Sequence, residues 1–504
     1  MLSDEAMDRI EGAGRRSAAS RTTLATASGR AVGALALSCW ACTGQVLAES
    51  APQRARDAVV RDAASHDGVG EAKLSLDDFT AATTCAECHP IQAADWAISS
   101  HAHAMHDSVF QALVALASKD SADTPAFCLS CHSNVGTAAR GLQAESGFDS
   151  YAPVVMEGVT CESCHRMTDV LRPFNAGHVL DPKAPMQGTV RAGDASPYHD
   201  TQRSATLGSA ESCASCHDVQ TPAGVVLEQP YREWNVAPAK DDGLVCVDCH
   251  MPKVYGEAAK DFGLQARPLR RHVFLGPGLL TRAAALDSST NRALAAEVKA
   301  QLQRSVALEL PPVQALCAAP LGRIGVTVSS RVTGHRFPTG SAFFRELQLH
   351  LRVVDGAGKL IYQTGEGGAP PPEAMSALLF DERGERTLFP WRAARVTNLA
   401  LEPLERRSLE LTFALPKELQ WPLTAAVSLR FRTFPARLLE DLELDPSVAA
   451  DVELDTQTAR IELLECKESA PLGLCPEGSA AEAGGRRFRS VPLADGSPFK
   501  VPGG

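Results

Sequence analysis

Apolar and polar residues alternate with a period of two through much of the second half of the chain. Leu347, Leu349, Leu351 and Val353 alternate with polar residues, and similar runs lie at 324–332, 360–362, 409–415, 427–431 and 460–464. A period of two is typical of strands that bury one face. About seven short strands separated by turn signals predict a β-sandwich, which we place at 311–466. The same alternation puts His350 on its solvent face.

Two other stretches have a clear pattern. Residues 279–308 follow a helical rhythm that is interrupted near Asp287, which predicts a helical connector at 279–310. Near the start, an apolar run at 31–42 follows several arginines and precedes Val46-Leu47-Ala48. The run is too short to cross a bilayer and is typical of a secretory signal cleaved near Ala48. A short buried helix is the alternative. We interpret 1–48 as the signal, 49–74 as a linker and 467–504 as an irregular tail.

The stretch between the linker and the connector, at 75–278, contains one pentapeptide, Cys-x-x-Cys-His, five times. Its thiol pairs are Cys85 and Cys88, Cys128 and Cys131, Cys161 and Cys164, Cys213 and Cys216, and Cys246 and Cys249, and the His residues are His89, His132, His165, His217 and His250. This motif is the attachment site of a c-type haem: the two thiols bond to the porphyrin, and the His is the proximal iron ligand.

Zinc is the alternative for paired cysteines, but it explains neither the following His nor an odd number of pairs. The motifs therefore predict five covalently bound haem c groups. Five haems in this stretch leave little room for an ordinary core, so helices should be short, loops long and the haems themselves the core. The spacing from Cys128 to Cys161 equals that from Cys213 to Cys246, which suggests that each of these two motif pairs holds a stacked haem couple.

Composition narrows the class of partner. The chain has 504 residues, 44% of them hydrophobic and only 5% aromatic, with a net charge of -11. This charge disfavours nucleic acid and favours redox protein partners with a basic docking patch. No stretch after the signal is long and apolar enough to span a membrane. Of the fifteen cysteines, those outside the motifs are Cys39, Cys42, Cys317, Cys466 and Cys475, whose pairing stays open.

The residues around the motifs resemble a family. The matching segments are Asp95-Trp96 with His101, Glu157-Gly-Val-Thr-Cys161, Tyr231-Arg-Glu-Trp234, Cys249-His250-Met-Pro252, Arg271-His272-Val-Phe274 and Gly334-His335-Arg-Phe337-Pro-Thr-Gly340. Together they resemble the multihaem cytochromes grouped with cytochrome c-554, which are related to hydroxylamine oxidoreductase and octahaem tetrathionate reductase. The resemblance covers roughly 84–340. The named cytochrome has four haems and no large C-terminal domain, so its haem layout does not transfer.

Family pattern and local context together suggest five distal ligands. His101, His272 and His335 match family segments, whereas His178 and His199 stand in loops near the third and fourth motifs. Five proximal and five distal His would close every iron. The alternatives are that a loop His is merely solvated, that His103 or His106 replaces His101, or that a Met is a ligand.

These patterns predict a multidomain α+β protein, with a mostly helical, loop-rich multihaem domain followed by an all-β, sandwich-like C-terminal domain. The leading functional hypothesis is an exported electron carrier of the periplasm or outer cell surface, not an enzyme with its own substrate. A second hypothesis is an oxidoreductase that acts on a small nitrogen or sulfur compound at one five-coordinate haem. A third is a docking subunit of an extracellular electron-transfer assembly, and peripheral association with the outer membrane stays open.

Overall fold

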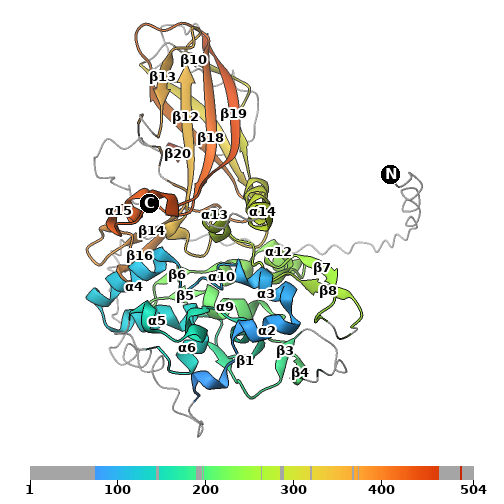
Figure 1. The fold of residues 1–504 in the computed structure, drawn as a ribbon. Helices are drawn as coiled ribbons and strands as arrows, with labels where there is room; N and C mark the ends of the chain where they lie inside the picture. The colour runs from blue at the N-terminus through green and yellow to red at the C-terminus, as the bar shows by residue number, and fades with distance from the viewer. Residues whose placement is uncertain are drawn as a thin grey trace, which may run out of the picture. The chain divides into compact units, whose positions relative to one another are not determined.

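A computed structural model describes residues 74–142, 147–188, 196, 198–260, 262, 264–283, 289–317, 320–365, 368–369, 371–372, 374–464 and 489–490 (Figure 1). The chain divides into two compact units, Met1–Ala55 and Arg56–Gly504, and every described residue belongs to the second. The predicted signal, nearly all of the linker and most of the tail lie outside the described residues, as do Cys39, Cys42, Cys466 and Cys475. The domain boundaries predicted above stay predictions.

Residues 74–277, here called the motif region, consist of short helices joined by loops and two-stranded sheets, in agreement with the expected lack of long elements. Its helices are η1 (Leu76–Asp78), α2 (Ala82–Cys88), α3 (Pro90–Ala97), α4 (Ser108–Asp120), α5 (Asp123–His132), α6 (Asn134–Ala138), η2 (Phe148–Ser150), α7 (Pro153–Met156), α8 (Cys161–His165), α9 (Ala210–His217), α10 (Pro230–Trp234), α11 (Pro238–Asp241) and α12 (Cys246–His250). Proline opens α3, α7, α10 and α11, where its missing N–H has no helical partner to lose.

The strands of the motif region form small sheets. The pairs are β1 (Met167–Val170) with β2 (His178–Leu180), β3 (Met186–Gly188) with β4 (Thr201–Arg203), β5 (Val219–Gln220) with β6 (Val226–Glu228), and β7 (Lys253–Gly256) with β8 (Arg267–Arg270). All but the parallel pair β3 and β4 are antiparallel. These pairs are too small to bury a core of their own.

Residues 278–464, here called the sheet region, begin with the expected helices. These are α13 (Gly278–Ala283) and α14 (Ser289–Ser305). The strands that follow are β9 (Val306–Glu309), β10 (Val313–Cys317), β11 (Leu321–Ser330), β12 (Glu346–Val354), β13 (Leu360–Gln363), β14 (Ala377–Phe380), β15 (Arg386–Thr387), β16 (Arg395–Asn398), β17 (Arg406–Ala414), β18 (Leu423–Arg432) and β19 (Asp451–Leu464). Short helices lie between them: η3 (Ala342–Phe344), η4 (Pro390–Arg392), α15 (Ala436–Asp441) and η5 (Pro446–Val448).

The sheet region contains three sheets. One has the order β10-β19-β18-β12-β13, another joins β20 (Arg489–Ser490) to β17, β11 and β9, and the third is β15-β14-β16. Alternate residues of β12 and β18 are buried, and the antiparallel register sets Leu349 opposite Leu429. The predicted alternation is therefore present, and His350 is half-buried on the other face. The all-β character is not confirmed, because the helix α15 lies within 311–466.

One large apolar cluster joins the two larger sheets. It contains Ile324 and Phe413 from one sheet, Leu347 and Leu429 from the other, and residues of α14. The cluster extends to Val273 and Leu275, which directly follow His272. The packed interior of the sheet region therefore also fixes a segment of the motif region. In the described part of the chain, no helix is both long and apolar enough to cross a membrane.

Candidate haem-binding site

Each of the five motifs lies on a short helix or at its end. The motif helices are α2, α5, α8, α9 and α12. In a helix, residues i, i+3 and i+4 share one face, so this spacing turns both thiols and the following His to the same side. None of the ten motif cysteines forms a disulfide. The local fold thus presents two nucleophilic sulfurs and one imidazole together, as covalent haem attachment requires.

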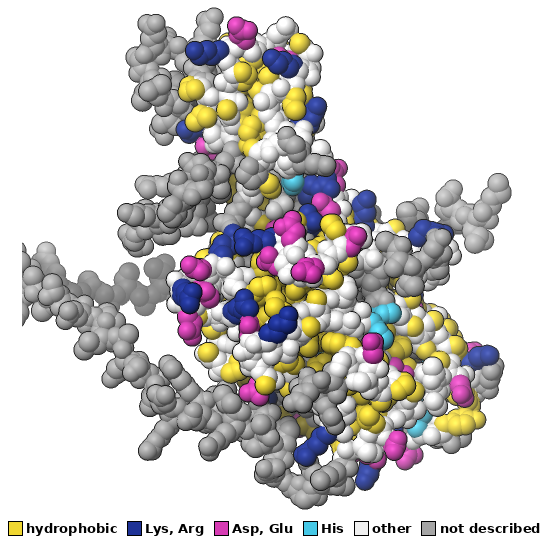
Figure 2. Space-filling view, turned by 60° about the vertical axis from the view of Figure 1, so that its left-hand side comes forward, with side chains coloured by type: hydrophobic (Ala, Val, Ile, Leu, Met, Phe, Trp, Pro, Cys, Tyr) yellow, Lys and Arg dark blue, Asp and Glu magenta, His cyan; other side chains and the backbone are white. Residues whose placement is uncertain are grey.

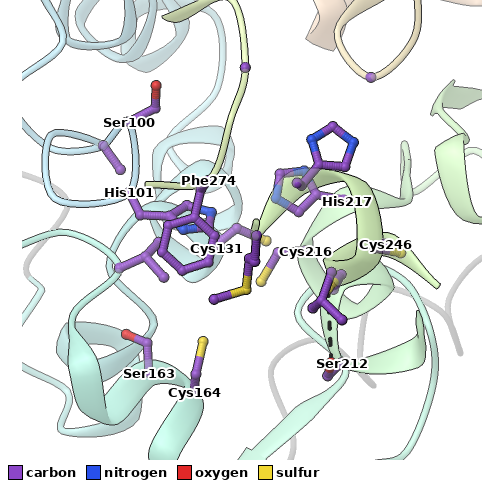
Figure 3. Close-up of a pocket in the computed structure, with 18 of the residues that line it drawn as sticks. Ser100, His101, Cys131, Ser163, Cys164, Ser212, Cys216, His217, Cys246 and Phe274 are labelled. Atoms are coloured by element: carbon purple, nitrogen blue, oxygen red, sulfur yellow. Dashed lines mark hydrogen bonds between the residues drawn. The ribbon is translucent and has the colours of Figure 1, made fainter. Parts of the chain in front are cut away.

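The motif helices surround one continuous cavity of about 4080 Å³. A pocket for one drug-sized ligand measures about 300–1,000 Å³, so this cavity has space for several large groups. All ten motif cysteines and all five motif His residues line it. Figure 3 shows part of it, with His101 beside Phe274, His217 across the cavity, and Cys131, Cys164 and Cys216 around them.

Four motif His residues face a second His across the cavity. The ring centroids are 6.3 Å apart for His89 and His199, 6.0 Å for His101 and His217, 6.2 Å for His165 and His272, and 6.2 Å for His250 and His335. His nitrogens bind a metal at about 2.0–2.1 Å, which puts the centroids of two rings on opposite sides of one ion roughly 6 Å apart. The residues therefore fit four irons, each held between two imidazoles.

Backbone carbonyls orient several of these rings through one ring nitrogen. The Nδ1 atoms of His89, His165 and His250 each lie 2.7 Å from a carbonyl oxygen, of Ala258, Gln187 and Leu275. Those of His272 and His335 lie 3.1 Å and 2.8 Å from the carbonyls of Arg270 and Arg336. Metal-binding His typically donates its second N–H in this way. Nε2 is thereby left as the iron-binding atom.

Burial keeps four of the facing imidazoles neutral. It lowers the pKa of His101 to about 3 and the pKa of His217, His272 and His335 to about 4. A neutral ring has a lone pair for a metal, whereas a protonated ring has none. At neutral pH these side chains are therefore in the form that binds iron.

The second motif is different, because its His132 faces a phenyl ring. Phe110 stacks on it with centroids 3.7 Å apart and planes at 2°, and no second His ring faces it among the described residues. His178, the remaining predicted distal ligand, lies elsewhere: its Nε2 is 3.2 Å from Asn134 Nδ2 and its Nδ1 is 3.2 Å from Ser215 Oγ. Both ring nitrogens are occupied by side chains. Closure of an iron at His132 by a second His therefore stays a prediction.

Two buried carboxylates hold the backbone at His272 and next to His335. Asp95 accepts hydrogen bonds from Arg271 Nε and from the backbone N–H of His272, both at 3.1 Å. Glu233 accepts from the backbone N–H of Arg336 at 3.1 Å and from Thr339 Oγ1 at 2.5 Å, both in the segment that directly follows His335. Neither carboxylate is among the site residues predicted from the sequence. The signal was present, since both stand inside the family segments quoted for Trp96 and Trp234.

Neighbouring sulfurs show which motifs are adjacent. Side-chain contacts pair Cys85 with Cys161, Cys131 with Cys216, and Cys213 with Cys246. The fourth and fifth motifs are thus adjacent, and the stacking of their haems stays a prediction. The sulfur neighbours of the second and third motifs, however, belong to the fourth and first. Equal spacing along the chain did not identify them, because adjacency here is set by how the helices pack.

Comparisons with known proteins agree with this site. The family model for cytochrome c554 and c-prime matches residues 84–166. The crystal structure of a penta-haem cytochrome c552 from Thermochromatium tepidum has a TM-score of 0.55 and 20% sequence identity, covering 76% of this chain and 99% of that chain. At this identity the likeness concerns the fold alone. The CARDB domain of a Pyrococcus furiosus protein in complex with di-metal ions matches with 13% identity over 32% of this chain and 86% of its own, at a TM-score of 0.13.

No curated protein matched this chain. The five motifs, the cytochrome c554 family model and the shared fold identify a multihaem c-type cytochrome that transfers electrons and carries covalently bound haem c. The resemblance predicted from the residues around the motifs is thereby confirmed. The wider relation to hydroxylamine oxidoreductase and octahaem tetrathionate reductase stays a prediction.

Proposed function

We propose that the protein is an exported pentahaem cytochrome that carries electrons between redox partners, with four of its haems closed by His pairs. The four facing ring pairs, at 6.0–6.3 Å, are the observation that carries this proposal. Haem iron supplies reversible one-electron exchange, at a potential set by its axial ligands, burial and nearby charge. The protein fixes both imidazoles and leaves no open position at these four sites.

The distal ligands are held rigidly, which suits electron exchange without substrate binding. Arg271 Nη2 lies 2.5 Å from Asp95 Oδ1, and this pair holds the backbone beside His272. We take the two larger sheets as a sandwich that supplies His335, with Glu233 fixing the loop. A ligand held this way does not need to move when the iron changes charge. His101, His199, His272 and His335 are the distal ligands of the proposal.

Export and partner choice rest on the sequence. The Arg-rich segment, apolar run and Ala48 site favour secretion, and covalent haem attachment belongs to compartments outside the bacterial cytoplasm. We therefore place the mature protein in the periplasm or at the outer cell surface. A net charge of -11 favours partners with a basic docking patch.

Two measurements test the carrier proposal. Mass spectrometry of the mature chain should show the mass of five haems. Electron paramagnetic resonance of the oxidised protein should show four low-spin irons, as two His ligands require. Fewer haems, or high-spin signals from more than one iron, would contradict the assignment of ligands.

A second candidate function is favoured at His132. Phe110 covers its ring, and His178 is held by Asn134 and Ser215. A haem attached here would therefore have His132 as its one protein imidazole, which would leave its sixth position open. Such a site suits an oxidoreductase that acts on a small nitrogen or sulfur compound. Both functions are compatible, because closed haems can deliver electrons to an open one.

The open site is tested by ligand addition. Cyanide, hydroxylamine or nitrite should shift the spectrum of one high-spin haem and leave the other haems unchanged. His178→Ala should not alter the number of low-spin irons, because His178 is not assigned to an iron. An entirely low-spin wild type that gains a high-spin haem in His178→Ala would restore His178 as a ligand and remove the second function.

A further inference from the structure

Arg345 is a cation inside the protein without a countercharge. It follows η3 and lines the haem cavity. One of its N–H groups donates to the Thr433 carbonyl, and its guanidinium carbon lies 5.1 Å from the centre of the Phe434 ring. Among the described residues no carboxylate comes within ion-pair distance of it. The remaining N–H groups have no protein acceptor there.

Contacts and charges place Arg345 in the part of the cavity that belongs to the second motif. The carboxylates of Glu228 and Asp107 are close enough for their charges to act on the Arg345 guanidinium. Glu228 also acts on the thiol of Cys131, and Asp107 on the imidazole of His132. Residues of η3 pack in one apolar cluster with Val109 of α4 and Leu227 of β6. Arg345 therefore lies beside the haem whose sixth position is open.

The neighbouring carboxylates do not neutralise this cation. Glu228 instead accepts a hydrogen bond from Ser341 Oγ at 2.5 Å, and burial raises its pKa. Asp107 accepts from the backbone N–H of Phe110 at 2.8 Å as the N-cap of α4. A buried charge without a partner is expensive, and burial accordingly lowers the pKa of Arg345. An anion that occupies the cavity would remove this cost.

We propose that Arg345 binds a carboxylate or small oxyanion in the pocket of the haem attached at Cys128, Cys131 and His132. The planar guanidinium fork matches two oxygens of such a group. The anion has two sources: a propionate of that haem, or an exogenous ion that enters the open position. The inference rests on the proposed haem at this motif and names the class of ligand that its pocket takes.

The experiment compares Arg345→Gln and Arg345→Lys with the wild type and with Arg395→Gln as a matched control. Arg395 also stacks on a phenyl ring, with its guanidinium carbon 3.9 Å from the centre of the Phe380 ring, but it does not line the cavity. Formate is titrated into the oxidised protein as the carboxylate probe and carbon monoxide into the reduced protein as the neutral probe. Haem midpoint potentials are recorded for all four proteins.

For an exogenous anion, Arg345→Gln should weaken formate binding at least about tenfold and leave carbon monoxide binding unchanged, with Arg345→Lys in between. For a propionate, formate binding should be unchanged, but one midpoint potential should fall in Arg345→Gln and largely recover in Arg345→Lys. If formate binding and the haem midpoint potentials of Arg345→Gln both match those of the Arg395→Gln control, the inference is overturned. If the wild type binds neither probe, the open site fails, and the midpoint potentials still decide whether Arg345 holds a propionate.

Discussion

The motif region and the sheet region differ in what fills their interiors. In the sheet region, Phe413, Phe431 and Leu429 are almost fully buried within one cluster that spans the two larger sheets. The motif region has two clusters of its own, with a few buried residues each, around a cavity of about 4080 Å³. Figure 2 shows hydrophobic side chains at the molecular surface between charged groups, with His side chains among them. One interior is made of side chains, and the other requires prosthetic groups.

The largest effect should come from removing haem. Expressed without cytochrome maturation, the motif region should lose its structure, because its apolar lining would be left around an empty cavity. The sheet region should keep its fold. Hydrogen exchange should show fast exchange across α2–α12 and slow exchange in β12 and β18. Equal protection of both regions in the haem-free chain would contradict the comparison.

A smaller effect is expected in the packed interior. Leu429→Ala removes a fully buried side chain between two strands and should lower the free energy of unfolding by about 2–5 kcal/mol. Denaturant titration followed by tryptophan fluorescence measures this change. Leu360→Ala, at a half-exposed position, is the control and should change it by less than about 0.5 kcal/mol. A large loss of haem in Leu429→Ala would show that the two interiors are not independent.

A local effect is expected where the two regions meet at one iron. His335→Ala removes the sheet region's ring that faces His250 at 6.2 Å. One low-spin haem should become high-spin, while the free energy of unfolding of the sheet region stays nearly unchanged. Electron paramagnetic resonance counts the spins. Imidazole added to the variant should restore the low-spin signal, and an unchanged spin count would remove His335 as a ligand.

The smallest effect concerns a contact between the regions at the end of α4. Asp120 Oδ2 accepts hydrogen bonds from Arg392 Nε at 2.6 Å and Trp391 Nε1 at 2.7 Å, and these bonds lower its pKa. Its stabilising contribution is complete above the ordinary Asp pKa of about 3.9 and disappears as pH falls through the lower folded value. Because the pair is exposed, Asp120→Asn should cost less than about 1 kcal/mol at pH 7 and a smaller amount at pH 3, below the ordinary Asp pKa. Thermal unfolding at several pH values measures this, and an equal cost at both pH values would contradict it.

Local patterns were sufficient for much of the fold. The strand at β12 and the helix at α14 follow from periodicity, because burial on one face repeats at fixed intervals along the chain. The five motifs follow from spacing alone. Spacing did not predict which motifs are adjacent, because the contact of Cys131 with Cys216 depends on how separate helices pack.

The distal ligands show the same limit. His199 and His178 look alike in sequence, as lone His residues in polar loops. Their difference arises from distant partners: His199 faces His89, whereas Asn134 and Ser215 engage both nitrogens of His178. Phe110 next to His132 also left no local signal, because a Phe on an apolar helix face is ordinary core. Such assignments need the tertiary contacts.

The position of His335 in the sheet region has a consequence for biosynthesis. Ribosomes deliver the chain from its N-terminus, so all five attachment motifs emerge before the strands that surround His335. With the proposed ligands, the haem at His250 would be attached early but would receive its second imidazole only after the C-terminal strands have assembled. Completion of that last coordination bond would report that the whole polypeptide has folded, and a chain cut short after α14 would keep its colour while leaving this iron exposed.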